Sequence, residues 1–169
     1  MATMKKNIIF VTGFIGSDRV GLARHLAAQH NMEFVSLNEM IEVKDGRSIL
    51  RIAMTMGEHE VRNKEYEALT ELLNRDNLVV AVSDGIVLDD QCLSLLAQGT
   101  VVVADRDLSP QELWQKAISE AHPLYAFLSQ EAPQAEGAEG AKETECNPGF
   151  QKFLELYHAR EPIYRRIAG

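Results

Sequence analysis

The chain has 169 residues, 46% of them hydrophobic, and a formal net charge of −8. This length and composition suit one folded domain with a real core and argue against a disordered chain. The acidic balance argues against nucleic acid as the main partner, because phosphate backbones are bound by basic surfaces. No stretch is long enough to cross a membrane. Cys92 and Cys146 indicate no disulfide framework, so we expect a cytoplasmic protein.

Strand-like and helix-like segments alternate along the chain. Short apolar and β-branched runs predict strands over residues 7–12, 33–36, 78–82 and 100–104. Helical periodicity predicts helices over residues 19–30, 47–56, 58–75 and 150–164, and capping residues predict further helices after Ser36, Asp89 and Ser109. The alternation predicts a parallel sheet with helices on both faces, the α/β class.

Residues 130–149 differ in composition from the rest of the chain. They are rich in alanine, glutamate and glycine and contain almost no apolar residues. Such a segment has little to bury, so we predict a mobile surface insertion. No internal repeat is present, and residues 1–169 are predicted to form one domain.

The segment GFIGSDRVG, residues 13–21, lies between a predicted strand and a predicted helix. A glycine-rich turn in this position is typical of a phosphate-binding loop. However, the segment lacks the Gly-Lys-Ser/Thr that such a loop needs. Asp18 is placed to cap the helix, where its carboxylate would occupy the anion-binding N–H groups and repel a triphosphate.

Several further segments follow in a definite order: IIFVTGFIG, HLAAQHNMEFVSLNEMIE, GEHEVRNKEYEAL, NLVVAVSDG, GTVVVADRDL, HPL and REPIYRRIA. Together they resemble the shikimate kinases, from about residue 8 to residue 168 except for the insertion. The resemblance implies a three-layer α/β/α P-loop kinase-like fold with a parallel sheet of five strands, of which this sequence supplies four. It also implies phosphoryl transfer from Mg-ATP to the 3-hydroxyl of shikimate. If Gly169 is the natural end, the adenine pocket is incomplete, and the free sheet edge is expected to support a homodimer.

The phosphate loop of the family reads Gly-x-x-Gly-x-Gly-Lys-Ser/Thr-x-x-Gly. Gly13, Gly16 and Gly21 match its flanks, but the stretch between the last two is two residues short. The lysine and the Mg²⁺-binding hydroxyl therefore have no clear counterparts. Among the residues present, Ser17 is the candidate to replace the hydroxyl and Arg19 is the candidate to replace the lysine.

Two arginines match family residues that hold the shikimate carboxylate. Arg62 lies in Gly-Glu-x-x-Val-Arg-x-x-Glu and Arg160 lies in Arg-Glu-Pro-Ile-Tyr. The planar guanidinium suits a bidentate carboxylate contact. For Arg62, an alternative is an ion pair within the helix, with Glu58 or with Glu65.

Three other family positions are altered. Asn38 replaces the aspartate that binds the shikimate hydroxyls, or it merely belongs to a capping box begun by Ser36. Gly85 is the one glycine left where the family has three, and its alternative role is a tight turn. His122, in His-Pro-Leu, replaces the lid arginine that reaches the transferred phosphate.

The losses affect the phosphate, metal, lid and adenine features together, while Arg62 and Arg160 remain. The leading hypothesis is a catalytically inactive or impaired relative of shikimate kinases that acts as a small-carboxylate binding or interaction module. This hypothesis assigns no certain cofactor, and we predict no metal site. The first alternative is a working kinase that uses Mg-ATP through Ser17 and Arg19. The second is a structural or dimerisation protein.

Overall fold

The computed structural model describes residues 5–104, 106–120 and 148–168. Its elements, in chain order, are β1 (Ile8–Thr12), α1 (Arg19–His30), β2 (Glu33–Ser36), α2 (Leu37–Asp45), α3 (Ile49–Met56), α4 (Glu58–Leu72), β3 (Leu78–Ala81), the 3₁₀ helix η1 (Asp84–Leu88), α5 (Asp90–Leu96), β4 (Thr100–Val103), α6 (Pro110–Glu120) and α9 (Pro148–Ile167). The predicted order of strands and helices is confirmed. The tight turn expected at Gly85 is part of the helix η1 instead.

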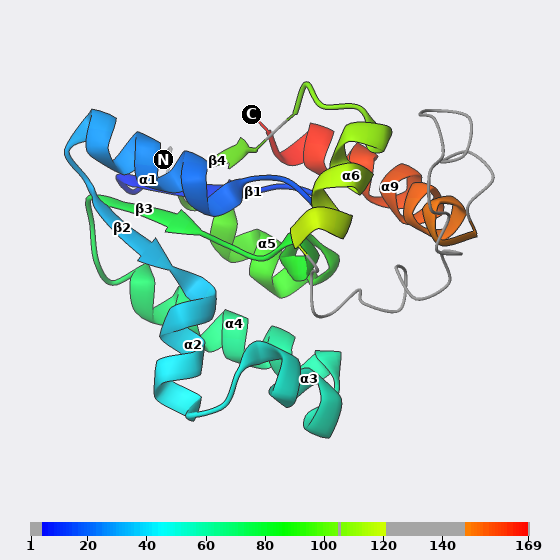
Figure 1. The fold of residues 1–169 in the computed structure, drawn as a ribbon. Helices are drawn as coiled ribbons and strands as arrows, with labels where there is room; N and C mark the ends of the chain where they lie inside the picture. The colour runs from blue at the N-terminus through cyan, green and yellow to red at the C-terminus, as the bar shows by residue number, and fades with distance from the viewer. Residues whose placement is uncertain (1–4, 105, 121–147, 169) are drawn as a thin grey trace.

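The four strands form one parallel sheet in the order β2-β3-β1-β4. Alternate residues of β1 and β3 face opposite sides, so the sheet has two apolar faces. α1 packs on one face against Val11 and Val79, whereas Phe10 and Val80 on the other face join a larger core with α4, α5 and α9. Figure 1 shows the resulting three layers, as the α/β/α prediction requires.

Local capping fixes most helix starts. Ser36 accepts a hydrogen bond from the Glu39 amide at 3.4 Å, and Ser109 and Glu112 cap each other reciprocally at α6. The helix predicted over 47–56 begins later, because the Ser48 hydroxyl caps α3. Capping boxes are readable from sequence because both partners lie within one turn.

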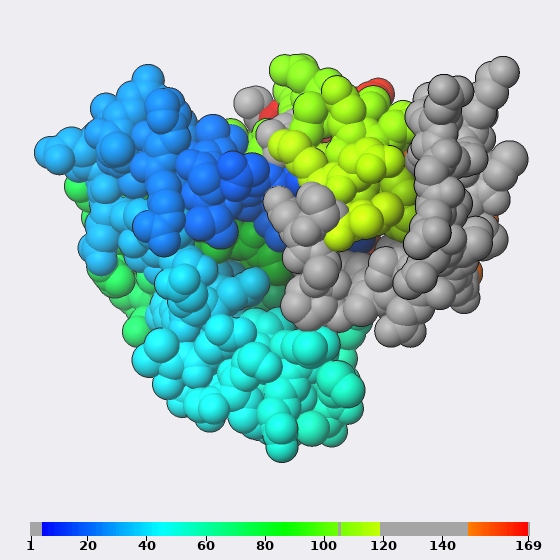
Figure 2. Space-filling model, viewed as in Figure 1, coloured from blue at the N-terminus to red at the C-terminus, as the bar shows by residue number. Residues whose placement is uncertain are grey.

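In the view of Figure 1, α2, α3 and α4 lie in the lower part of the molecule. Figure 2 shows α2 and α3 as a cyan lobe below the surface of α1. The partly buried Asp45 bridges Arg47 and Lys64 and so ties the end of α2 to α4. These contacts hold the pKa of Asp45 well below its usual value, Arg47 being the largest cause.

None of the helices in the described residues combines the length and apolar character needed to cross a membrane. Within these residues β4 pairs only with β1 and forms one edge of the sheet. The homodimer through this edge stays a prediction, since an open edge can pair with a second chain.

Candidate functional site

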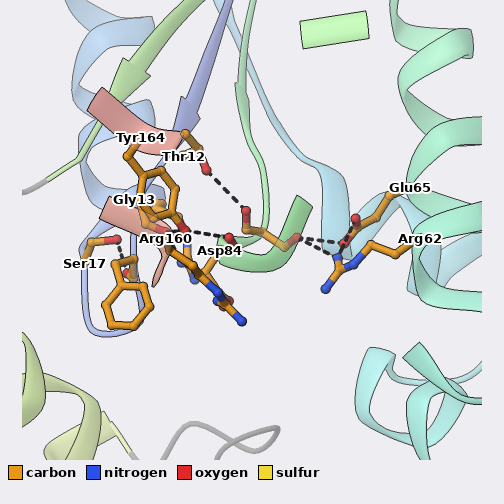
Figure 3. Close-up of polar contacts among 11 residues, drawn as sticks. Thr12, Gly13, Ser17, Arg62, Glu65, Asp84, Arg160 and Tyr164 are labelled. Atoms are coloured by element: carbon orange, nitrogen blue, oxygen red, sulfur yellow. Dashed lines mark hydrogen bonds and ion pairs between the residues drawn. The ribbon is translucent and has the colours of Figure 1, made fainter. Parts of the chain in front are cut away.

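The carboxyl ends of the parallel strands meet at one edge of the sheet, where ligand sites of α/β folds usually lie. The loop after β1 and the turn after β3 lie side by side there. The hydroxyl of Thr12 donates to the Ser83 carbonyl at 3.3 Å and joins the two (Figure 3).

The loop after β1 is packed as core. Phe14 is only 4% exposed and makes edge-on ring contacts with Phe153, Tyr157 and Tyr164 of α9 at centroid distances of 5.0, 5.5 and 6.5 Å. Ile15 is fully buried. The first half of the candidate phosphate loop is therefore held against α9 by apolar side chains.

Gly16 is held by α6. Its φ of +89° lies in the left-handed region, and a Cβ at this position would overlap the Leu113 carbonyl oxygen. Figure 1 shows α6 passing close to the carboxyl end of β1. Glycine is thus required at this position for helix packing, whatever the loop binds.

Ser17 closes the turn. Its amide and hydroxyl both donate to the Phe14 carbonyl, at 3.0 and 2.6 Å, and the residue is 7% exposed. A Cβ on Gly13 would come within 2.5 Å of the Ser17 hydroxyl. Gly13 therefore provides space for Ser17.

Asp18 is the N-cap of α1, as predicted. Its Oδ1 accepts from the Gly21 amide at 2.9 Å. A Cβ on Gly21 would overlap this carboxylate. The flanking glycines that match the phosphate-loop pattern thus accommodate Ser17 and Asp18 here.

Arg19 turns back across the loop. Its Nη1 donates to the Gly13 carbonyl at 3.1 Å and lies 3.7 Å from Oδ1 of Asp84. The two side chains are 15% and 5% exposed. Arg19 therefore reaches the candidate site, where its positive charge is paired with the buried carboxylate of Asp84.

Asp84 also pairs with Arg160. Oδ2 of Asp84 lies 2.9 Å from Nη1 of Arg160, whose guanidinium stands 5.6 Å from the centre of the Phe14 ring. The Tyr164 hydroxyl lies 2.6 Å from the Asp84 carbonyl oxygen and 3.2 Å from that of Gly13. Figure 3 shows Asp84 at the centre of these contacts, which link α9 to both loops.

A second cluster surrounds Arg62. Its Nη1 donates to both carboxylate oxygens of Glu65 at 2.7 Å and to the Ser83 hydroxyl at 3.3 Å. That hydroxyl donates in turn to Glu65 at 2.7 Å. Of the two alternatives left open by helical spacing, Glu65 and not Glu58 is the hydrogen-bonded partner.

Burial affects the pKa values of both Arg62 and Glu65. The Glu65 side chain is fully buried, and its desolvation raises the pKa of Glu65 against the opposing effects of Arg62 and Ser83. Burial, the largest single cause, would lower the pKa of Arg62, but Glu65, Asp84 and Glu58 together outweigh it and the pKa lies above its usual value. Arg62 and Glu65 therefore form an ion pair in which the glutamate is the more deeply buried partner.

Gly85 gives Arg62 its position. A Cβ on Gly85 would overlap Nη2 of Arg62, so the guanidinium lies directly against η1. The side-chain hydrogen bonds that Arg62 makes to described residues all start from Nη1. Among the described residues, none accepts a hydrogen bond from Nη2, which lies beside Gly85.

Asn38 stands at the start of α2, one residue beyond its first residue. Ser36 caps that helix, so the capping prediction is confirmed and uses no atom of the Asn38 side chain. Oδ1 of Asn38 is buried and accepts no hydrogen bond from the described residues. A buried acceptor of this kind calls for a donor.

The remaining predicted features fall elsewhere. His122 and residues 130–147 lie outside the described residues. Within the described part, no cluster of three or more histidine, cysteine or acidic side chains could hold a metal ion. Burial is the main cause that raises the pKa of the Cys92 thiol to about 12, so this cysteine is not a nucleophile near neutral pH.

Sequence reasoning missed two members of the site. Asp84 pairs with Arg160 across 76 positions in the chain, so no local pattern signals it. Tyr164 hydrogen-bonds the carbonyls of Gly13 and Asp84 from α9. Its place four residues after Arg160, on the same face of a helix, was the available signal.

Comparisons with known proteins agree with this architecture. The shikimate kinase family model matches residues 16–168, so the chain belongs to the shikimate kinase family. The match begins at Gly16 and leaves out β1.

Curated relatives include three that are informative. The bifunctional shikimate kinase/3-dehydroquinate synthase of Thermotoga maritima is 34% identical over 69% of this chain, which spans only 23% of that protein. The shikimate kinase of Aromatoleum aromaticum is 27% identical over 95% of this chain and 81% of its own length. That of Chlorobaculum tepidum is 30% identical over 94% and 77%.

Solved structures resemble the fold closely. Shikimate kinase from Acinetobacter baumannii in complex with shikimate superposes with a TM-score of 0.75 at 26% identity, covering 98% of this chain and 82% of that one. The shikimate kinase from Bacteroides thetaiotaomicron gives 0.72 at 19% identity over 95% and 82%, a likeness of fold alone.

Proposed function

We propose that this member of the shikimate kinase family transfers no phosphoryl group and instead binds a small carboxylate, of which shikimate is the first candidate. The observation that carries the proposal is the Asp18 carboxylate at the N-terminus of α1. A helix N-terminus attracts phosphate through its free amides and its positive dipole end. Here a side chain of the protein itself uses that position and places a negative charge there.

The rest of the loop supports the same conclusion. Phe14 and Ile15 are core residues, and Gly16 lies against the backbone of α6. A cradle for phosphate needs backbone amides that converge on open space. This loop is instead filled by the protein on two sides.

Charge in the site also opposes ATP. The candidate replacement for the missing lysine, Arg19, lies beside the buried carboxylate of Asp84. Phosphoryl transfer depends on cations that neutralise the charge developing on the transferred group. An arginine already balanced by an acid supplies little of that neutralisation.

Arg62 supports the carboxylate half of the proposal. Among the described residues, Glu65 and Ser83 contact the guanidinium through Nη1, and Nη2 lies beside Gly85. A guanidinium fixed on one side and available on the other suits a planar carboxylate. Asn38 adds a buried acceptor at the same edge of the sheet, which fits a ligand hydroxyl.

Isothermal titration calorimetry with Mg-ATP and with shikimate tests both parts of the proposal, the loss of ATP binding and the binding of a carboxylate. We expect no heat from Mg-ATP and measurable binding of shikimate. Arg62→Lys, which keeps a charge for Glu65 but loses the planar fork, should weaken shikimate binding about tenfold. Arg51→Lys on the exposed surface of α3 is the matched control and should leave the affinity unchanged.

Different results would contradict the two parts of the proposal, the absence of phosphoryl transfer and the binding of a carboxylate. Binding of Mg-ATP at micromolar strength would favour the working kinase, in which Arg19 serves the phosphates. Shikimate binding that is absent, or that is equal in the wild type and Arg62→Lys, would remove Arg62 as the carboxylate ligand.

A further inference from the structure

A cavity of about 320 Å³ lies at the edge of the sheet opposite the candidate site. The strands are parallel, so their amino ends meet at one edge, and Thr100 begins β4 there. The start of β4, the end of α5 and the end of α9 bound the cavity. Figure 1 shows β4 and the end of α9 close together. The described residues that line it include none of the candidate site, so the cavity is a separate feature.

The wall of this cavity is mostly apolar. Its apolar lining comes from Leu93, Leu96 and Ala97 of α5, Val101 of β4 and Ile167 of α9. Leu96 is only 1% exposed and belongs to the main core, so packing fixes this part of the wall. A hydrocarbon chain placed here would be removed from water together with these side chains, which is favourable.

Two cations line the same cavity. Lys5 precedes β1, Arg166 lies in the last turn of α9, and both residues are exposed. Neither forms an ion pair with a described residue, and the described lining contains no acidic side chain. The cavity is therefore positively charged, although the chain as a whole has a net charge of −8. A carboxylate complements this charge.

We infer that the cavity binds the anion of a medium-chain fatty acid. Its hydrocarbon chain lies against α5 and β4, and its carboxylate lies between Lys5 and Arg166. The apolar wall and the charge carry the inference together, because the wall alone would accept any apolar molecule and the cations alone any small anion. The volume is at the lower end of the range of small-molecule sites, so a chain of about eight carbons is the first candidate.

Isothermal titration calorimetry of the full chain with sodium octanoate, below the concentration at which it forms micelles, tests the inference. We expect one site, and binding about fourfold weaker for each methylene removed in heptanoate and hexanoate. Octylammonium has the same chain length with the opposite charge and should bind at least about tenfold more weakly than octanoate. Equal affinity for octanoate and octylammonium, or no heat from octanoate at millimolar concentration, would overturn the inference.

The double variant Lys5→Gln/Arg166→Gln removes both cations and should weaken octanoate binding about tenfold or more. Lys44→Gln/Arg51→Gln is the matched control. It removes the same charge from exposed positions on α2 and α3 that do not line the cavity, and it should bind octanoate as the wild type does. Equal losses in the two double variants would reduce the effect to net charge and contradict the inferred site.

A third variant tests the apolar wall. Ala97 is the exposed residue that ends α5, so Ala97→Phe narrows the cavity without disturbing the core. We expect weaker octanoate binding by a variant with an unchanged circular dichroism spectrum, whereas unchanged affinity would overturn the inference. Saturating shikimate should leave the octanoate affinity unaltered. Because the readout involves neither Arg62 nor shikimate, failure here is distinguishable from failure of the proposed function.

Discussion

Replacing Arg62 by alanine is expected to lower the free energy of unfolding by about 3–5 kcal/mol. Glu65, whose side chain is fully buried, would lose the guanidinium that contacts both of its oxygens. The Ser83 hydroxyl alone would then face the carboxylate. Urea unfolding followed by circular dichroism measures the change.

Two control variants separate the buried pair from a general effect of charge. Lys44→Ala removes an exposed ion pair with Glu71, whose side chains are 55% and 52% exposed, and should change stability by about 1 kcal/mol or less. The double variant Arg62→Met/Glu65→Leu replaces both charges by apolar groups and should recover most of the loss. Equal losses for Arg62→Ala and Lys44→Ala would show that the pair is not buried as described.

The loss in Arg62→Ala should also depend on pH. Burial already raises the pKa of Glu65 in the folded wild type, and removing Arg62 raises it further. The folded variant then binds a proton more tightly than the unfolded chain, so its stability falls as pH rises above the unfolded value of about 4.3. The deficit relative to the wild type should therefore be smallest in acid and largest at neutral pH. A deficit independent of pH would contradict this explanation.

Gly16→Ala is expected to destabilise the fold by about 2–5 kcal/mol. One part is the left-handed backbone, with φ of +89°, and the other is overlap of the new methyl group with the Leu113 carbonyl of α6. The Leu113 carbonyl belongs to the backbone of α6, so it cannot move aside as the end of a flexible side chain could. Urea unfolding provides the measurement.

Gly46→Ala isolates the packing contribution. Gly46 has a similar φ of +83°, but no atom lies within 4 Å of the position its Cβ would take. Its substitution should cost only the backbone part, about 1–2 kcal/mol. If the two variants were equally stable, the contact between Gly16 and α6 would be refuted.

Much of the fold could be predicted because its signals are local. Asp18, Ser36 and Ser109 cap helices within one turn of themselves, and each was identified from its neighbours. The helix expected to reach residue 75 ends at Leu72, because the Arg75 amide bonds the Leu72 carbonyl three residues back and tightens the last turn. The residue at which a helix ends depends on the backbone geometry of its last turn, which the spacing of apolar residues in the sequence does not reveal.

The site was less predictable because its contacts are distant in sequence. Helical spacing offered both Glu58 and Glu65 as partners of Arg62, and the structure distinguishes them by the hydrogen bonds of Arg62 and Ser83 to Glu65. Asp84 could be read as an acid in a turn, but not as the partner of Arg160. Gly16 is needed for packing against α6, which lies almost a hundred residues further along the chain. Pairings of this kind follow from tertiary packing alone.

The proposed absence of phosphoryl transfer can be measured in a turnover assay with ATP, Mg²⁺ and shikimate, with the Acinetobacter baumannii shikimate kinase as the positive control. We expect no shikimate-dependent release of ADP above background at enzyme concentrations where the control reacts fully. Turnover at an ordinary enzymatic rate that Arg19→Ala abolishes would contradict it and establish Arg19 as the functional replacement for the missing lysine.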